Sequence, residues 1–177
     1  MPHLVVSSLS RLAETARTHS AQEMVTLLSP QTEFVRPPGI RPDRHLFLDM
    51  NDISIETDGL RIPDNSHVAQ LIEFAKEWDR NAPLLIHCWM GISRSTAAAY
   101  IVAAALRPDA NPMQIALELR HRSPSATPNT RMVILADRLL DRNGDMVRAI
   151  SHIGRGADAY EGTPFVLPLD FQTDSTA

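Results

Sequence analysis

Ten residues in the middle of the chain, 87–96 (His-Cys-Trp-Met-Gly-Ile-Ser-Arg-Ser-Thr), combine side chains suited to nucleophilic chemistry on an anionic group. They follow an apolar run that predicts a buried strand and precede one that predicts a buried helix. A loop entering a helix presents unpaired N–H groups and the positive end of the helix dipole, so it binds anions. Gly91 lets the backbone bend around the anion, and Arg94 can hold two of its oxygen atoms. The segment predicts a site for a phosphate-like anion.

Cys88 is expected to place its sulfur among the same N–H groups. Positive surroundings favour the reactive thiolate, so Cys88 can act as a nucleophile without a neighbouring base. The hydroxyl of Ser95 can reach back to the sulfur and stabilise it as a leaving group. A lone cysteine is often an inert core residue, but an inert one needs neither Gly91 nor Arg94 nearby. Because the chain has one cysteine, an intramolecular disulfide and a multi-cysteine metal site are excluded.

The pattern of apolar residues predicts an α/β domain around this loop. Short apolar runs predict strands, and helical spacing predicts helices. The strands are expected at 3–7, 24–28, 45–48 and 83–87, and the helices at 10–19, 66–80, 95–106, 111–121, from 129 to before 144, and 145–154. Ser8 or Ser10 is expected to cap the first helix. This order predicts a mostly parallel central sheet flanked by helices, with a helical C-terminal half.

The chain has 177 residues, which is enough for one domain with its own core. We expect a single domain over residues 1–155, followed by a tail, 156–177, that docks as an extended arm or is partly disordered. The apolar runs are shorter than a membrane span requires, and residues 1–10 lack the pattern of a secretory signal. These features favour a cytoplasmic protein without a membrane partner.

The net charge of −4 is unevenly distributed along the chain. Residues 94–155 carry nine arginines and five acidic residues, whereas residues 156–177 carry four acidic residues and no base. On charge alone, an arginine-rich solvated helix face is the simpler interpretation. The pattern also suits a small anion or a phosphorylated partner, and it does not favour nucleic acid, which generally needs a larger positive footprint. The seven histidines are scattered without ligand spacing, so we expect no metal and no other cofactor.

The motif Cys-x5-Arg-Ser, written out as His-Cys-x-x-Gly-x-Ser-Arg-Ser, resembles the signature of the cysteine-dependent protein tyrosine and dual-specificity phosphatases. The resemblance covers roughly residues 3–153 and implies a phosphotyrosine phosphatase-like fold. It implies that Cys88 forms a phosphocysteine intermediate and that Ser95 assists the leaving sulfur. It also implies that the phosphate is bound by Trp89, Met90, Gly91, Ile92, Ser93 and Arg94.

Two further residues are expected to support the loop. Pro128-Asn129 is similar to the segment that backs the phosphate loop in this family, so Asn129 is expected behind the loop. His87 is expected to orient the backbone of Cys88. A satisfied core histidine is almost as consistent with the sequence at this position.

A general acid is expected upstream of the loop, because expelling an alkyl or tyrosyl oxygen from phosphorus requires a proton. Asp52 lies three residues beyond Asp49, where the chain should have left the strand. The segment 48–53 is similar to the acid loop of the same family, and its Asn-Asp pair matches at Asp52. Asp49 is the second candidate. Asp58 is expected in a turn and Asp64 at a helix start.

These residues together predict a phosphomonoester hydrolase, foremost a compact, bacterial-type protein tyrosine or dual-specificity phosphatase. None of the five x residues is basic, whereas relatives that act on phosphoinositides tend to carry Lys or Arg there. We therefore expect a single phosphomonoester as substrate, foremost phosphotyrosine on a protein. Two alternatives stay open: a rhodanese-like sulfurtransferase, and a pseudophosphatase that binds a phosphorylated ligand without turnover. The sequence leaves the oligomeric state open.

Overall fold

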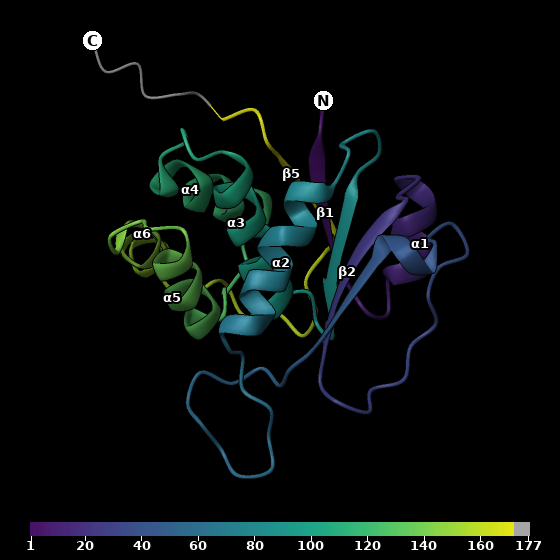
Figure 1. Cartoon of the computed structure of the whole chain (residues 1–177), viewed down its shortest axis with the longest axis horizontal. Helices are drawn as coiled ribbons and strands as arrows, with labels where there is room; N and C mark the ends of the chain where they lie inside the picture. The colour runs from purple at the N-terminus through teal and green to yellow at the C-terminus, as the bar shows by residue number, and fades with distance from the viewer. Residues whose placement is uncertain (172–177) are drawn as a thin grey trace.

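The computed structural model describes residues 1–171, which form a five-stranded sheet with helices on both faces (Figure 1). The strands are β1 (His3–Ser8), β2 (Glu23–Leu28), β3 (His45–Asp49), β4 (Leu84–Cys88) and β5 (Phe165–Pro168). The helices are α1 (Leu12–Thr18), α2 (Asn65–Glu77), α3 (Arg94–Leu106), α4 (Pro112–Arg122), α5 (Thr130–Leu139) and α6 (Asp145–Ile153), and a short 3₁₀ helix, Pro42–Arg44, precedes β3. The predicted α/β class, with a mostly parallel central sheet flanked by helices, is confirmed.

The strands follow the order β3-β2-β4-β1-β5 across the sheet. The first four run parallel, and β5 is antiparallel to β1. Because parallel strands end at the same edge, the loops after β1, β2, β3 and β4 come together there. The pairing of Ser8 with Cys88 and of Leu28 with Asp49 marks this edge, which lies at the bottom of Figure 1.

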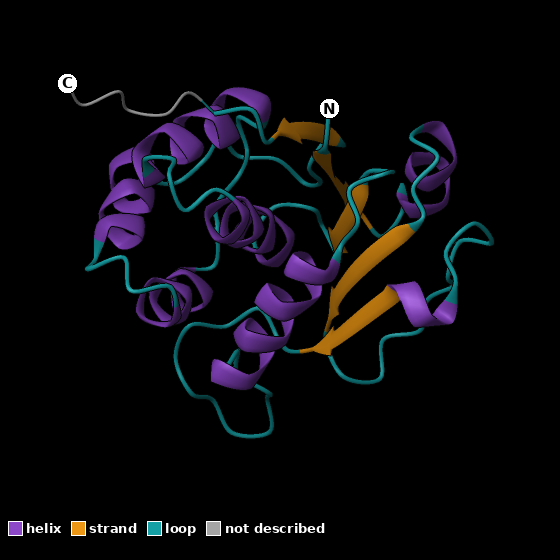
Figure 2. Ribbon diagram, turned by 45° about the horizontal axis from the view of Figure 1, so that its top comes forward, coloured by secondary structure: helices purple, strands orange, loops and turns teal. Residues whose placement is uncertain are grey.

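Burial on both faces explains the sequence of β4, in which every residue is buried. Helices α2 to α6 cover one face of the sheet and α1 covers the other (Figure 2). Helix α3 is buried along nearly its whole length, as predicted for a helix that is apolar almost all round. Its polar first turn is buried as well, so the residues that begin α3 are fixed by the core.

The start of α1 differs from the prediction. The helix begins at Leu12 with Arg11 in the capping position, and no side chain caps it. Ser10 donates a hydrogen bond to Glu161 instead, and the hydroxyl of Ser8 lies 3.4 Å from that of Ser10. The prediction that one of these serines caps the helix was therefore wrong, because a distant segment binds them.

The segment beyond α6 crosses the molecule and ends as a strand. Residues 155–164 lead from α6 to β5, which pairs with β1 from His3 to Val6. Of the predicted tail, residues 172–177 lie outside the described residues. None of the helices within residues 1–171 has the length and apolar character needed to cross a membrane.

Candidate active site

Residues 88–94, named the Cys88 loop here, join the end of β4 to the start of α3. The sulfur of Cys88 is 3.1 Å from the hydroxyl oxygen of Ser95 and accepts a hydrogen bond from the backbone N–H of Gly91 at 3.3 Å. Gly91 has a φ of +70°, and a Cβ at this position would lie 2.9 Å from the backbone nitrogen of Ser8. Both the left-handed conformation and the close approach therefore require glycine.

Backbone hydrogen bonds from three distant segments fix the carbonyl groups of the Cys88 loop. The N–H of Leu9 binds the Trp89 carbonyl at 3.0 Å, that of Gly162 binds the Met90 carbonyl at 2.8 Å, and that of Thr127 binds the Ile92 carbonyl at 2.9 Å.

A trans peptide is planar, so its C=O and the following N–H point in opposite directions. The Met90 carbonyl is bonded to Gly162, so the N–H of Gly91 in the same peptide points the opposite way. The hydrogen bond from Gly91 to the Cys88 sulfur agrees with this geometry. The bond from Gly162 to the Met90 carbonyl therefore fits the orientation of the Gly91 N–H toward the sulfur.

Arg94 is buried, with 5% of its surface exposed, although it carries a positive charge. One terminal nitrogen donates to the Met50 carbonyl at 2.7 Å and to the Ser29 hydroxyl at 3.4 Å. Its Nε is fully buried and has no hydrogen-bond partner among residues 1–171. A buried charged donor without a partner is costly unless a ligand completes it, and a carboxylate or phosphate fits the planar guanidinium best.

Asp52 is exposed and lies directly against the Cys88 loop. Its Oδ1 accepts a hydrogen bond from the Ser93 hydroxyl at 2.7 Å and another from the side-chain amide of Asn129 at 2.9 Å. Asn129 also caps α5, because its Oδ1 accepts from the backbone N–H of Met132. Thus Asn129 connects the Asp52 segment to the start of α5, and Ser93 connects it to the loop.

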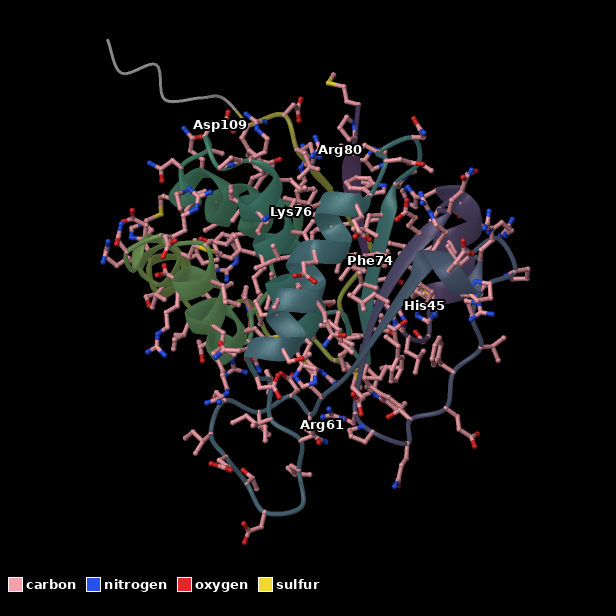
Figure 3. The ribbon with its side chains drawn as sticks, in the orientation of Figure 1. His45, Arg61, Phe74, Lys76, Arg80 and Asp109 are labelled. Atoms are coloured by element: carbon pink, nitrogen blue, oxygen red, sulfur yellow. The ribbon has the colours of Figure 1, made fainter. Side chains whose placement is uncertain are left out.

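The other acidic candidates are held elsewhere. Asp49 is the last residue of β3 and forms an ion pair with Arg61, which lies below the sheet in Figure 3. Asp64 caps α2, as predicted, and forms a reciprocal capping box with His67. Asp58 lies in a turn. Of the candidates, only Asp52 has a hydrogen bond to the Cys88 loop within the described residues.

His87 lies at the end of a chain of side chains that sequence analysis missed. Its Nε2 is 2.8 Å from the hydroxyl of Thr26, which in turn is 2.8 Å from Nε2 of His45. The ring of Phe34 packs against both histidines. Burial lowers the pKa of His87 and of His45 to about 4, so both rings are neutral near pH 7. These values include smaller lowering contributions, from His45 and Arg94 on the pKa of His87 and from Arg36 on that of His45.

The neutral state fixes the direction of each hydrogen bond in this chain. Nδ1 of His87 is 3.4 Å from the carbonyl oxygen of Cys88, which can only accept. Nδ1 must therefore carry the hydrogen, and Nε2 must accept from Thr26. Thr26 then accepts from Nε2–H of His45. The sequence gives no sign of this chain, because Thr26 and His45 look like ordinary strand residues.

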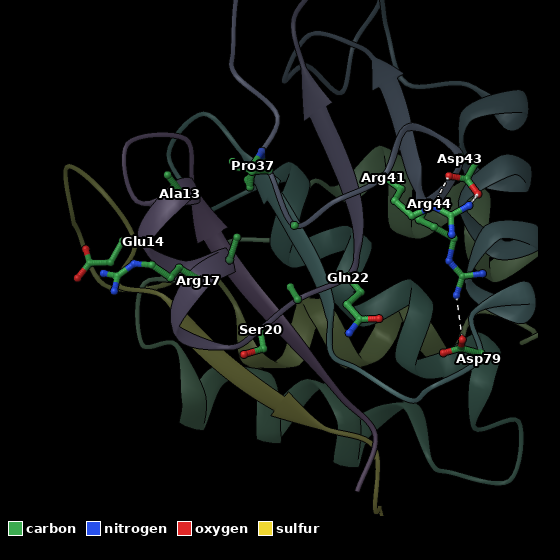
Figure 4. A pocket seen from close by; sticks show the side chains of 14 residues that line it. Ala13, Glu14, Arg17, Ser20, Gln22, Pro37, Arg41, Asp43, Arg44 and Asp79 are labelled. Atoms are coloured by element: carbon green, nitrogen blue, oxygen red, sulfur yellow. Dashed lines mark hydrogen bonds and ion pairs between the residues drawn. The ribbon is translucent and has the colours of Figure 1, made fainter.

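A large pocket lies away from this site. It has a volume of about 1120 Å³ and lies at the amino ends of β2 and β3 (Figure 4). Its arginines Arg41 and Arg44 are ion-paired with Asp43 and Asp79. Within residues 1–171, no group of three or more His, Cys, Asp and Glu side chains is placed to hold a metal ion.

Known proteins resemble this chain in fold, whereas comparisons of sequence find no match. No protein-family model matches the sequence, and no curated protein matches it. The fold is similar to solved structures of dual-specificity and tyrosine phosphatases.

A mouse putative dual-specificity phosphatase, solved with zinc tungstate, is 16% identical, with a TM-score of 0.58 over 81% of this chain and 84% of that one. Human DUSP28 is 16% identical, with a TM-score of 0.59 over 79% and 92%. The human tyrosine phosphatase-like serine/threonine/tyrosine-interacting protein is 17% identical, with a TM-score of 0.59 over 78% and 91%. The chain therefore has the fold of the cysteine-dependent tyrosine and dual-specificity phosphatases, as the Cys-x5-Arg-Ser motif predicted.

Proposed function

We propose that this protein hydrolyses phosphomonoesters through a phosphocysteine intermediate, as a protein tyrosine or dual-specificity phosphatase. The observation that carries the proposal is the buried Arg94 with its unpartnered Nε, at the end of a loop in which the N–H of Gly91 donates to the Cys88 sulfur. A bound phosphoryl group supplies the missing acceptor for Arg94. It also places its phosphorus in front of the nucleophile.

The first half of the reaction forms a covalent intermediate. The Cys88 thiolate attacks phosphorus, an S–P bond forms and the P–O ester bond breaks. Inward N–H groups and Arg94 stabilise the charge on the three equatorial oxygens. Asp52 gives a proton to the departing oxygen from Oδ2, because its Oδ1 already accepts two hydrogen bonds.

The second half regenerates the enzyme. Water attacks phosphorus, and the Asp52 carboxylate takes the proton that the water releases. The S–P bond breaks and the sulfur leaves as a thiolate. The hydroxyl of Ser95, 3.1 Å from the sulfur, then donates to it and stabilises the leaving group.

The side chains of the Cys88 loop support a substrate with a single phosphate. Trp89 is about half exposed, and Met90, Ile92 and Ser93 are partly exposed. None of them carries a positive charge that could meet a second phosphate on the same molecule. An apolar, aromatic rim suits the ring of phosphotyrosine, so we propose phosphotyrosine on a protein as the foremost substrate.

The test compares turnover with binding. We expect wild type to hydrolyse p-nitrophenyl phosphate in the presence of EDTA and to bind tungstate, the oxyanion that accompanies the mouse structure. Cys88→Ser should lower kcat by at least about 10⁴-fold while tungstate still binds, because the N–H groups and Arg94 remain. Full activity in this variant contradicts the proposal. Tungstate binding without turnover in wild type identifies a pseudophosphatase, and thiosulfate turnover identifies a sulfurtransferase.

A further inference from the structure

The segment between α6 and β5, residues 155–164, passes beside the Cys88 loop, and we name it the C-terminal strap. It is linked to the loop and to its neighbours by backbone hydrogen bonds. The N–H of Gly162 donates to the Met90 carbonyl at 2.8 Å, and that of Ala157 donates to the Pro124 carbonyl at 2.9 Å. Gly156 donates to the Thr127 hydroxyl at 3.1 Å.

Gly162 lies directly against the backbone of the Cys88 loop. A Cβ on this residue would lie 2.6 Å from the Gly91 carbonyl oxygen and 3.1 Å from the Gly91 carbonyl carbon. No other residue fits here without displacing one backbone from the other, since real Cβ atoms do not approach other atoms so closely. Gly162 therefore lies against two successive peptides of the loop. Its N–H binds the Met90 carbonyl, and the absence of a side chain lets it approach the Gly91 carbonyl.

The peptide that joins Met90 to Gly91 is the one that Gly162 holds. Its carbonyl accepts from the strap, and its N–H points the opposite way, to the Cys88 sulfur at 3.3 Å. The strap thus sets the orientation of the one backbone donor that is seen bonded to the sulfur.

Hydrogen bonds fix the chain on both sides of Gly162. The Glu161 carboxylate accepts from Ser10, and hydrogen bonds from Ser10 and Ser8 hold its pKa below the usual value. Beyond Gly162, β5 pairs with β1 from residue 165 to residue 168. A segment fixed on both sides can hold a peptide in one orientation, whereas a loose one cannot.

We infer that Gly162 is a positioning residue for the proposed reaction and that the C-terminal strap completes the anion cradle of the Cys88 loop. The inference rests on the proposed function, but it concerns a segment outside the Cys-x5-Arg motif. Loss of this contact lets the Met90–Gly91 peptide rotate, and its N–H then no longer faces the sulfur or the bound oxyanion.

The test is Gly162→Ala, with Gly39→Ala as the matched control. Neither glycine has a positive φ, and a Cβ on Gly39 would meet only the Ala21 carbonyl oxygen at an ordinary 3.6 Å. We expect Gly162→Ala to weaken tungstate binding and to lower kcat for p-nitrophenyl phosphate, each by about ten- to a hundredfold, the effect of one hydrogen bond to a charged group. Gly39→Ala should match wild type in both.

The tungstate dissociation constant separates positioning from stability. A variant that merely folds less well loses binding sites, yet its folded molecules keep the wild-type dissociation constant, which isothermal titration calorimetry measures. If Gly162→Ala does not fold, Glu161→Ala tests the same strap through its anchor, with a few-fold weaker tungstate binding expected. A wild-type dissociation constant and kcat in the folded strap variant overturn the inference alone. A wild-type protein that neither binds tungstate nor hydrolyses the ester overturns the proposed function as well.

Discussion

The two candidate acids, Asp52 and Asp49, are held by different partners. Oδ1 of Asp52 is held by Ser93 and Asn129, whereas Asp49 is taken up by Arg61. On the proposed function, Asp52 rather than Asp49 is therefore our candidate for the acid that protonates the leaving group, because only Asp52 is bonded to the Cys88 loop within the described residues. Asp49 instead links the end of β3 to the loop that follows Asp52.

We predict that Asp52→Asn lowers kcat for phosphotyrosine by about 10²–10⁴-fold, the contribution of a positioned general acid. The amide cannot release a proton to the leaving oxygen. The loss should be much smaller for a substrate whose leaving group is already a weak base. Rates for a phosphotyrosyl peptide and for p-nitrophenyl phosphate, each measured as a function of pH, check this prediction.

Asp49→Asn is the comparison for this experiment. It removes a carboxylate of the same segment, so it reports any general effect of changing charge there. If Asp49→Asn loses the alkaline limb of the rate profile while Asp52→Asn keeps it, the acid is Asp49.

At the scale of single elements, the first turn of α5 serves both the fold and the site. Asn129 accepts from Met132 as the helix cap and donates from its amide to Asp52. Asparagine and aspartate are equally good caps, but only asparagine also donates. One substitution can therefore separate the two roles.

We predict that Asn129→Asp leaves the thermal midpoint within a few degrees of wild type and lowers kcat by about tenfold or more. The cap survives, but a second carboxylate then faces Asp52 and repels it from the Cys88 loop. Thermal unfolding and phosphatase rates on the same preparations check this. Asn129→Ala removes the cap, so its free energy of unfolding should fall by about 1 kcal/mol. Equal rates in wild type and Asn129→Asp would show that the amide does not position Asp52.

Elements with strong local signals could be predicted from the sequence. The run Leu84 to His87 indicates a buried strand, and Asn111-Pro112 indicates a helix start, and both are found. Strand β5 could not be predicted, because four residues ending in Pro168 have a weak strand signal. The pairing with β1 stabilises it, and proline is tolerated there because the strand lies at the sheet edge.

Side chains near the Cys88 loop could be predicted more readily than the backbone groups that support it. Cys88, Arg94 and Ser95 lie within eight residues, so their types and spacing indicate the chemistry. Met50 and Gly162 act through a backbone carbonyl and a backbone N–H, which every residue except proline has. Their contribution depends on where the fold brings them, and no residue pattern records that.

At the scale of the whole molecule, the buried histidines make stability depend on pH. The pKa of His87 falls from 6.5 to about 4 on folding, chiefly through burial. Between these values the unfolded chain takes up a proton that the folded chain does not, so the free energy of unfolding decreases as the pH falls. Partly buried His45, whose pKa also falls to about 4, acts in the same direction.

We predict that the free energy of unfolding decreases by about 2 kcal/mol between pH 7 and pH 5 because of His87 alone. Urea unfolding at several pH values measures this change. His87→Gln is the control, since glutamine has no proton to take up in this range and its curve should be flatter. Parallel curves for the two proteins would contradict the assigned burial of His87.

The C-terminal strap has a consequence for the way the molecule is made. During translation, Cys88 and Arg94 are synthesised about 70 residues before Gly162. Domains begin to fold while the chain is still being made. The Met90 carbonyl has no partner from the strap until Gly162 is made, and the outer edge of β1 stays unpaired until β5 is made. A growing chain therefore carries every reactive side chain, beside an open sheet edge, before it has a complete anion cradle. If the strap completes the cradle as we infer, the proposed activity begins only once residues 162–168 have been added, well after the motif.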